Sequence, residues 1–146
     1  EYAASYQRWL TYTRQLGEFL GQYDLFVTPT LAAPPARIGE IVTPGWQRQA
    51  LKLVLMTHTS RLLLESGMVE KMAKENLKWV PYTQLANLTG VPAMSVPLHW
   101  CQNGLPLGVQ FVGAHGSEAL LLQVAASLEQ AAPWFDSVPE VAPAAV

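Results

Sequence analysis

Residues 81–113, which read PYTQLANLTGVPAMSVPLHWCQNGLPLGVQFVG, decide the fold of this chain. The first part of this stretch, 82–88, has the length of about two turns of helix. Gly90 predicts the end of that helix, because glycine adopts a positive φ without steric cost. Pro92 cannot continue a helix and biases the residue before it towards an extended backbone. The stretch therefore begins as a short helix followed by extended chain.

The extended part predicts a strand, a tight turn and a second strand. Residues 93–96 form a short apolar run closed by Pro97, which is the size of a buried strand. The dipeptide Asn103-Gly104 is a strong turn signal. Residues 107–112 are again apolar and predict the second strand.

The same stretch contains the motif N-x-x-G-x-P-A-x-S-x-P followed by G-L-P-x-G-x-Q-x-x-G. The matching residues are Asn87, Gly90, Pro92, Ala93, Ser95, Pro97, Gly104, Leu105, Pro106, Gly108, Gln110 and Gly113. Together with YDLFVTPT at 23–30 and the apolar pattern of 118–129, this motif resembles the carboxy-terminal part of the amidase signature family. The resemblance covers nearly the whole chain except about 41–78, which is a variable stretch in that family.

This resemblance implies an α/β fold in which the chain forms part of a mixed β-sheet flanked by helices. Residues 1–136 are then the carboxy-terminal part of an amidase signature domain, with a variable helical insert at about 41–78. The tail, 137–146, contains prolines among small residues, and we expect it to be disordered.

Apolar periodicity predicts the remaining elements. They are a helix over 1–22, a strand over 24–28, a broadly apolar helix over 46–64, a solvated segment over 67–78 and a helix over 118–131. The aromatic stripe of the first helix, which includes Trp9, Tyr12 and Phe19, is predicted to be core rather than a ligand site. Glu70 with Lys71 or Lys74 predicts ordinary surface ion pairs. Ser117 is placed to cap the last helix.

Composition excludes several classes of function. The net charge of −2 gives no electrostatic case for nucleic-acid binding. Cys101 is the only cysteine, which rules out an internal disulfide and a cysteine-based zinc site. The histidines do not have a recognisable metal-ligand spacing, and no glycine loop with phosphate-binding spacing occurs, so we expect no metal and no cofactor.

The start of the chain bears on its location and on whether it is a fragment. The chain begins at Glu1, inside a helical pattern, and has neither a signal-peptide pattern nor an apolar run of membrane-spanning length. We therefore expect a cytoplasmic protein without membrane contact, present here as a fragment. Half of the residues are hydrophobic and only 14% are charged. A fragment of this composition is expected to expose an apolar face and to be prone to self-association.

The resemblance also implies where the chemistry lies. Amidase signature enzymes hydrolyse amide bonds with a serine nucleophile, a second serine in a cis peptide and a lysine. These residues belong to a G-G-S-S-G-G stretch and to a lysine upstream of it, and this sequence contains neither context. No catalytic residue can therefore be assigned here, and we expect the chain alone to be inactive. The parent enzyme is expected to act on small linear or cyclic amides through its amino-terminal half.

Four residues are candidates for the wall of the substrate pocket. Thr28 and Thr30 end the strand over 24–28, and ligands of α/β sheets bind where strands end. His99 and Trp100 follow the S-V-P strand, and the resemblance places that loop towards the substrate. Glutamine-using members of the family carry an acidic residue at the position of Val80, which argues against a glutamine amidotransferase.

Two other hypotheses remain open. The chain can be a non-catalytic binding or assembly domain on the same scaffold, which predicts a polar surface and a defined monomer or oligomer. Alternatively, it can be a small independent hydrolase that uses Ser95 or Cys101, for example with His99 and Asp24. Hydrolysis by this chain alone, lost on Ser95→Ala or Cys101→Ala, would distinguish the last hypothesis.

Overall fold

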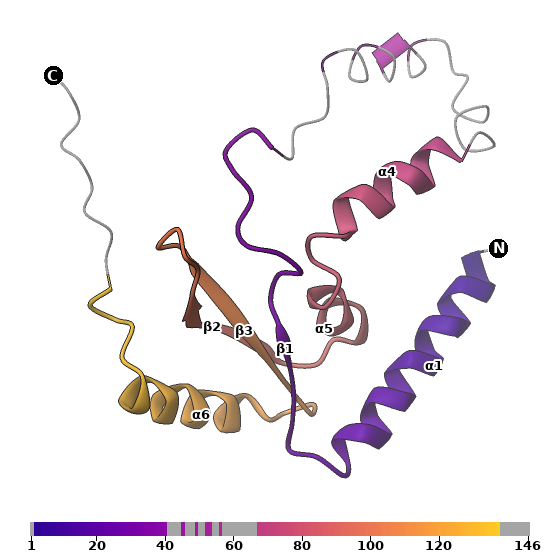
Figure 1. Cartoon of the computed structure of the whole chain (residues 1–146). Helices are drawn as coiled ribbons and strands as arrows, with labels where there is room; N and C mark the ends of the chain where they lie inside the picture. Colours follow the sequence, from indigo (N-terminus) through magenta and orange to yellow (C-terminus); the bar gives the residue numbers. More distant parts are fainter. Residues whose placement is uncertain are drawn as a thin grey trace, which may run out of the picture. The chain divides into compact units, whose positions relative to one another are not determined.

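The computed structural model describes residues 2–40, 45, 49, 52–53, 56 and 67–137 (Figure 1). The elements are α1 (Tyr2–Leu20), β1 (Leu25–Pro29), α4 (Met68–Leu77), α5 (Thr83–Thr89), β2 (Ala93–Trp100), β3 (Pro106–Gly113) and α6 (Glu118–Ala131). They fall into two compact units, one made of 1–30 with 83–146 and the other of 31–82. Most of the predicted helix over 46–64 and nearly all of the predicted tail lie outside the described residues. The α/β class is confirmed.

The sheet has three strands in the order β1-β3-β2, and both pairings are antiparallel. β2 and β3 form a hairpin whose turn contains Gly104 at φ 76°, as Asn103-Gly104 predicts. The Cys101 N–H donates to the Leu105 carbonyl at 2.8 Å and closes this turn. Gly90, at φ 70°, ends α5 and donates its N–H to the Ala86 carbonyl. The helix, stop and hairpin predicted from 81–113 are therefore all present.

Strand β2 is longer than the sequence predicts. Pro97 was expected to close the strand, but pairing with β3 continues to Trp100. β2 lies at an edge of the three-stranded sheet, and its register is irregular between Val96 and His99. Proline lacks the N–H that a ladder needs, so it is tolerated at an edge strand or a bulge. Pro97 occupies this irregularity instead of ending the strand.

One face of the sheet packs against α6 and forms the hydrophobic core. Val96, Phe111 and Leu121 are buried there, and Leu25, Met94, Val109, Val124, Ala125 and Leu128 pack around them. The period of two places Met94 and Val96 of β2 opposite Phe111 and Val109 of β3. Leu121, Val124, Ala125 and Leu128 therefore form the packed face of α6.

Ser117 does not cap α6, in contrast to the sequence prediction. It is the residue before the helix, but its side chain makes no capping bond. Its Oγ instead donates to the Ala114 carbonyl at 2.7 Å. A serine hydroxyl can bond locally to a preceding turn or to the helix start, and here the turn prevails. Glu118 in the first turn still complements the positive end of the helix.

The aromatic stripe of α1 is not core, so that part of the prediction is wrong. Leu16 and Leu20 are buried, whereas Trp9 and Tyr12 are exposed. Phe19 stacks on Tyr23, which follows the end of the helix, and the two ring centroids are 4.6 Å apart. The helical period correctly finds one face, but only the two leucines of that face are covered.

The unit formed by 31–82 contains α4 and its flanking segments. The Ala32 N–H donates to the Trp79 carbonyl at 3.1 Å, which joins the two ends of this unit. α4 carries the predicted Glu70–Lys74 ion pair at 2.8 Å, and both side chains are largely exposed. Among the residues that the structure describes, no helix combines the length and apolar character needed to cross a membrane.

Candidate functional site

The second face of the sheet, opposite α6, carries a group of uncharged polar side chains. Thr28 of β1 and Ser95 of β2 both pair with Gln110 of the central strand β3. Residues directly opposite each other in an antiparallel sheet share a face, so these three side chains form one row across it. Thr30 follows two residues after Thr28 and belongs to the same face. We call Thr28, Thr30, Ser95 and Gln110 the polar face.

Two hydroxyl groups of the polar face meet above the central strand. Thr30 Oγ1 and Ser95 Oγ lie 2.6 Å apart and form a hydrogen bond that links the residue after β1 to strand β2. The Thr30 N–H donates to the Gly108 carbonyl at 2.9 Å, which fixes Thr30 beside β3. A Cβ at Gly108 would lie 2.3 Å from Ser95 Oγ and 2.7 Å from Thr30 Oγ1. The hydroxyl pair therefore requires glycine at position 108.

The polar face is half-covered and contains a hydrogen-bonding group without a partner. Thr28 is only 8% exposed, and within the described residues its Oγ1 has no hydrogen-bond partner. Gln110 is also buried, whereas Ser95 is exposed. A buried hydroxyl without a bond is costly, so Thr28 is the least satisfied member of the polar face.

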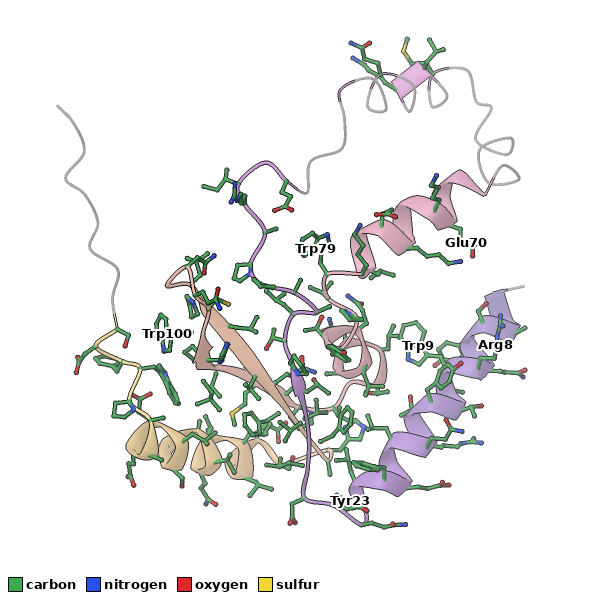
Figure 2. All side chains as sticks on the ribbon, viewed as in Figure 1. Arg8, Trp9, Tyr23, Glu70, Trp79 and Trp100 are labelled. Carbon is green, nitrogen blue, oxygen red and sulfur yellow. The ribbon has the colours of Figure 1, made fainter. Side chains whose placement is uncertain are left out.

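Three of the four predicted pocket residues share this face. Thr28 and Thr30 belong to it. Trp100 pairs with Pro106, which lies on the same face of β3 as Gly108 and Gln110, so Trp100 belongs to this face as well. Trp100 is 44% exposed and lies near the hairpin end of β2 (Figure 2). His99 pairs with Leu107, so it belongs to the opposite face of the sheet. The structure thus groups the threonines with Trp100 and separates His99 from them.

The structure does not assemble Ser95, His99 and Asp24 into a catalytic triad. Asp24 precedes Leu25, which pairs with Gly113, while His99 pairs with Leu107 at the other end of β3. These two positions on β3 are separated by about 20 Å at the rise of a strand. A triad needs direct hydrogen bonds, so these residues cannot act as one. Within the described part of the chain, no cluster of three or more His, Cys, Asp or Glu side chains could hold a metal ion.

Sequence reasoning missed Ser95 and Gln110 as members of the site. Both belong to the motif in 81–113, but Ser95 was considered only as a nucleophile. Thr28 and Thr30 are two residues apart, as are Gly108 and Gln110, and residues at this spacing share one face of a strand. This spacing is the sequence signal for the polar face. It becomes specific only with the strand order and register, which place these residues side by side.

Comparisons with known proteins agree with this architecture. Residues 1–122 match the family described as Amidase. A putative amidase AmiC of Mycobacterium leprae is 33% identical over 121 residues, which are 83% of this chain and 21% of that protein. A 6-aminohexanoate-cyclic-dimer hydrolase of Paenarthrobacter ureafaciens is 34% identical over 140 residues, which are 96% of this chain and 23% of that protein.

Solved structures show the same relationship. The structure of a 6-aminohexanoate cyclic dimer hydrolase superposes with a TM-score of 0.64 at 31% sequence identity, over 90% of this chain and 24% of that one. A structure of this hydrolase in complex with substrate matches equally well. The chain spans about a fifth to a quarter of the length of these relatives. With most of its residues matched in sequence and its fold matched in space, the chain belongs to the amidase family.

Proposed function

We propose that this chain is the carboxy-terminal segment of a carboxamide hydrolase and supplies scaffold and part of the substrate pocket. The observation that carries the proposal is the family match over 1–122. It is supported by relatives that are named a putative amidase and a 6-aminohexanoate-cyclic-dimer hydrolase. Residues 1–136 would form the carboxy-terminal part of the amidase domain. The nucleophile and the base would come from residues outside this sequence. The proposed substrate is a small amide, linear or cyclic.

The chemistry of the polar face fits an uncharged amide. Its side chains are hydroxyls and one primary amide, and none of the four is ionisable. A carboxamide presents one carbonyl acceptor and N–H donors, which hydroxyl and amide groups can complement. A charged substrate group would lack a counter-charge on this face and would be costly to bury. The face is therefore suited to holding the neutral part of an amide substrate.

The Thr30–Ser95 pair has a defined capacity for hydrogen bonding. Each hydroxyl has one proton, and one of these two protons is used in the bond between Thr30 and Ser95. The other O–H remains to donate outward, and Ser95 is the exposed member. We propose that this donor binds a substrate oxygen and that Trp100 contributes an apolar wall. Thr28 and Gln110 lie in the same row as Ser95 and complete the polar face beside the pair.

Amide hydrolysis tests this proposal most directly. The protein expressed from the complete gene and this chain alone are compared on hexanamide, benzamide and a cyclic amide. We expect turnover by the complete protein and none by this chain. Activity of this chain alone would overturn the proposal. Inactivity of both would favour the non-catalytic binding or assembly domain instead.

Variants of the polar face test the role of this segment in the complete protein. Ser95→Ala should raise KM about fivefold and change kcat less, because about 1 kcal/mol is lost with one neutral hydrogen bond. Ser127→Ala is the matched control, because its exposed Oγ bonds only within α6, to the Gln123 carbonyl. Equal effects of the two variants would remove the polar face from the pocket. A cytoplasmic location and self-association of the isolated chain belong to the same proposal, and imaging of the tagged protein and sedimentation test them.

A further inference from the structure

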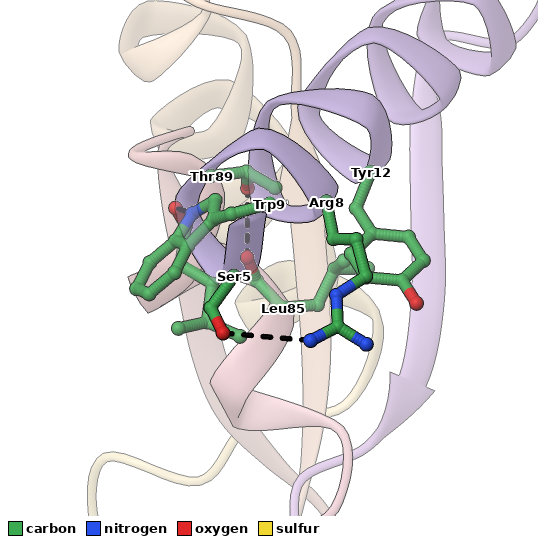
Figure 3. A pocket seen from close by; sticks show the side chains of 7 residues that line it. Ser5, Arg8, Trp9, Tyr12, Leu85 and Thr89 are labelled. Carbon is green, nitrogen blue, oxygen red and sulfur yellow. Dashed lines mark hydrogen bonds between the residues drawn. The ribbon is translucent and has the colours of Figure 1, made fainter. Parts of the chain in front are cut away.

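A pocket lies between α1 and α5, and no residue of the polar face lines it. It has a volume of about 300 Å³ and is lined by Ser5, Arg8, Trp9, Tyr12, Leu85, Leu88 and Thr89 (Figure 3). Both helices belong to the same compact unit. Small-molecule sites in proteins begin at about this volume. The pocket also explains why the aromatic side chains of α1 are exposed, since Trp9 and Tyr12 form its wall instead of filling the core.

Most polar groups of this pocket are already bonded to each other or to backbone. The Trp9 indole N–H donates to the Leu88 carbonyl, which ties α1 to α5. Thr89 Oγ1 donates to the Leu85 carbonyl at 2.7 Å. The lining therefore offers an apolar surface of an indole ring and two leucine side chains, braced by these bonds.

Arg8 has the largest unused hydrogen-bonding capacity in this pocket, and among the described residues the Tyr12 hydroxyl is also left without a bond. The Arg8 guanidinium donates to Ser5 Oγ at 3.4 Å, a long bond, and within the described residues the structure gives it no other partner. A guanidinium has five N–H donors in a planar fork, so most of them remain available. Among the described residues that line the pocket, Arg8 is the only charged one and none is acidic. This part of the pocket thus combines one cation with an apolar wall.

We propose that the α1–α5 pocket binds a small carboxylate that carries an aryl or alkyl group. Arg8 takes the carboxylate through paired N–H···O bonds, while Trp9 and the two leucines cover the apolar part. Guanidinium and carboxylate match in geometry as well as in charge. An ammonium ligand would be repelled, and a neutral amide would leave the charge of Arg8 without a partner. This site is separate from the polar face and does not depend on the proposed function.

The test is a titration of the ¹⁵N-labelled chain with 3-phenylpropionate, followed by ¹H–¹⁵N NMR. We expect saturable shifts of the Trp9 indole N–H and of amides in α1 and α5. The neutral analogue 3-phenylpropionamide and the cationic analogue 3-phenylpropylamine should bind at least about tenfold more weakly, because a charge-assisted bond is lost. Equal binding of all three compounds would overturn the proposal.

Two arginine variants make the test specific. Arg8→Gln should weaken the binding of 3-phenylpropionate at least about tenfold. Arg8→Lys should give an intermediate affinity, because lysine keeps the positive charge but lacks the planar guanidinium with its paired N–H donors. Arg14→Gln is the matched control, since Arg14 is an exposed arginine of α1 that does not line the pocket. Unchanged binding in Arg8→Gln would overturn the proposal. Chemical-shift changes that depend on the protein concentration and not on the ligand concentration would show that a second copy of the chain occupies the pocket. This result would also overturn the proposal.

Discussion

Position 108 is where a single methyl group would disturb the polar face most. Gly108→Ala places a Cβ 2.3 Å from Ser95 Oγ and 2.7 Å from Thr30 Oγ1, so the hydroxyl pair must separate. We expect a loss of about 1–3 kcal/mol in the free energy of unfolding, as for other overpacked sites. Denaturant unfolding of the chain measures it. Adding Ser95→Ala removes the nearest atom and should restore part of the lost stability.

Gly17→Ala is the control for this substitution. Gly17 lies inside α1, and a Cβ there would have no atom within 4 Å. Alanine should stabilise the helix by about 0.5–1 kcal/mol, because glycine is the poorer helix former. If Gly108→Ala had the same sign as Gly17→Ala, the close approach of the two hydroxyls across β3 would not exist.

At the scale of elements, α6 is held to the sheet by one side of its surface. Leu121 is 4% exposed and packs in the core, whereas its neighbour Leu122 is 71% exposed. Leu121→Ala should therefore cost about 2–5 kcal/mol in the free energy of unfolding. Leu122→Ala should change it by less than about 0.5 kcal/mol. Similar costs for both substitutions, measured by denaturant unfolding, would contradict the packing of α6 on Phe111.

The surface of α4 gives an expectation for pH. The hydrogen bond from Lys74 and then its charge lower the pKa of Glu70 below its usual value of 4.5. Because the folded pKa is the lower one, the pair stabilises α4 above pH 4.5, and this contribution is lost as pH falls through the folded pKa. Both groups are fully solvated, so the effect is small and salt weakens it.

Carboxyl ¹³C NMR measures this pKa directly. The titration midpoint of Glu70 should lie below 4.5 and move upward in Lys74→Gln. Lys71→Gln is the matched control on the same helix and should leave Glu70 unchanged. A midpoint of Glu70 that does not respond to Lys74→Gln would mean that the ion pair is not formed in solution.

The elements that the sequence predicts well are those governed by local chemistry. Gly90 and Gly104 predict the end of α5 and the hairpin turn, because the positive φ at each is a property of one residue. Pro97 and Ser117 mislead, since their effect depends on the edge position of β2 and on a competing carbonyl at Ala114. Local signals therefore fix most of the elements, and long-range pairing decides where strands end.

The candidate site is less predictable than the fold. The sequence predicts Thr28 and Thr30 from their place at the end of a strand, but Ser95, 65 residues after Thr30, joins them only because β2 and β1 both pair with β3. The exposure of Trp9 also depends on long-range packing, because the period of a helix shows a face but not what covers it. This site depends on the register between three strands and on what covers them. No single segment of the sequence can therefore predict it.

At the scale of the whole molecule, the described residues of the two units differ in burial. Within the described residues, every buried side chain lies in the unit formed by 1–30 and 83–146. Val112 of the central strand is fully buried, at 0% exposure. In the other unit, the described side chains of α4 are exposed. None of the described side chains of α4 is buried, and packing supplies most of the stability of a helix, so we expect this helix to open locally.

Hydrogen exchange should therefore divide the chain in the same way. Amides of β3, which pair with strands on both sides, should exchange slowest and report global unfolding. Amides of α4 should exchange much faster by local opening, and Leu121→Ala should speed exchange in β3 without affecting α4. Mass spectrometry of peptic peptides resolves these regions. Equal protection of α4 and β3 would mean that 31–82 shares the stability of the sheet, and the two units would then unfold as one.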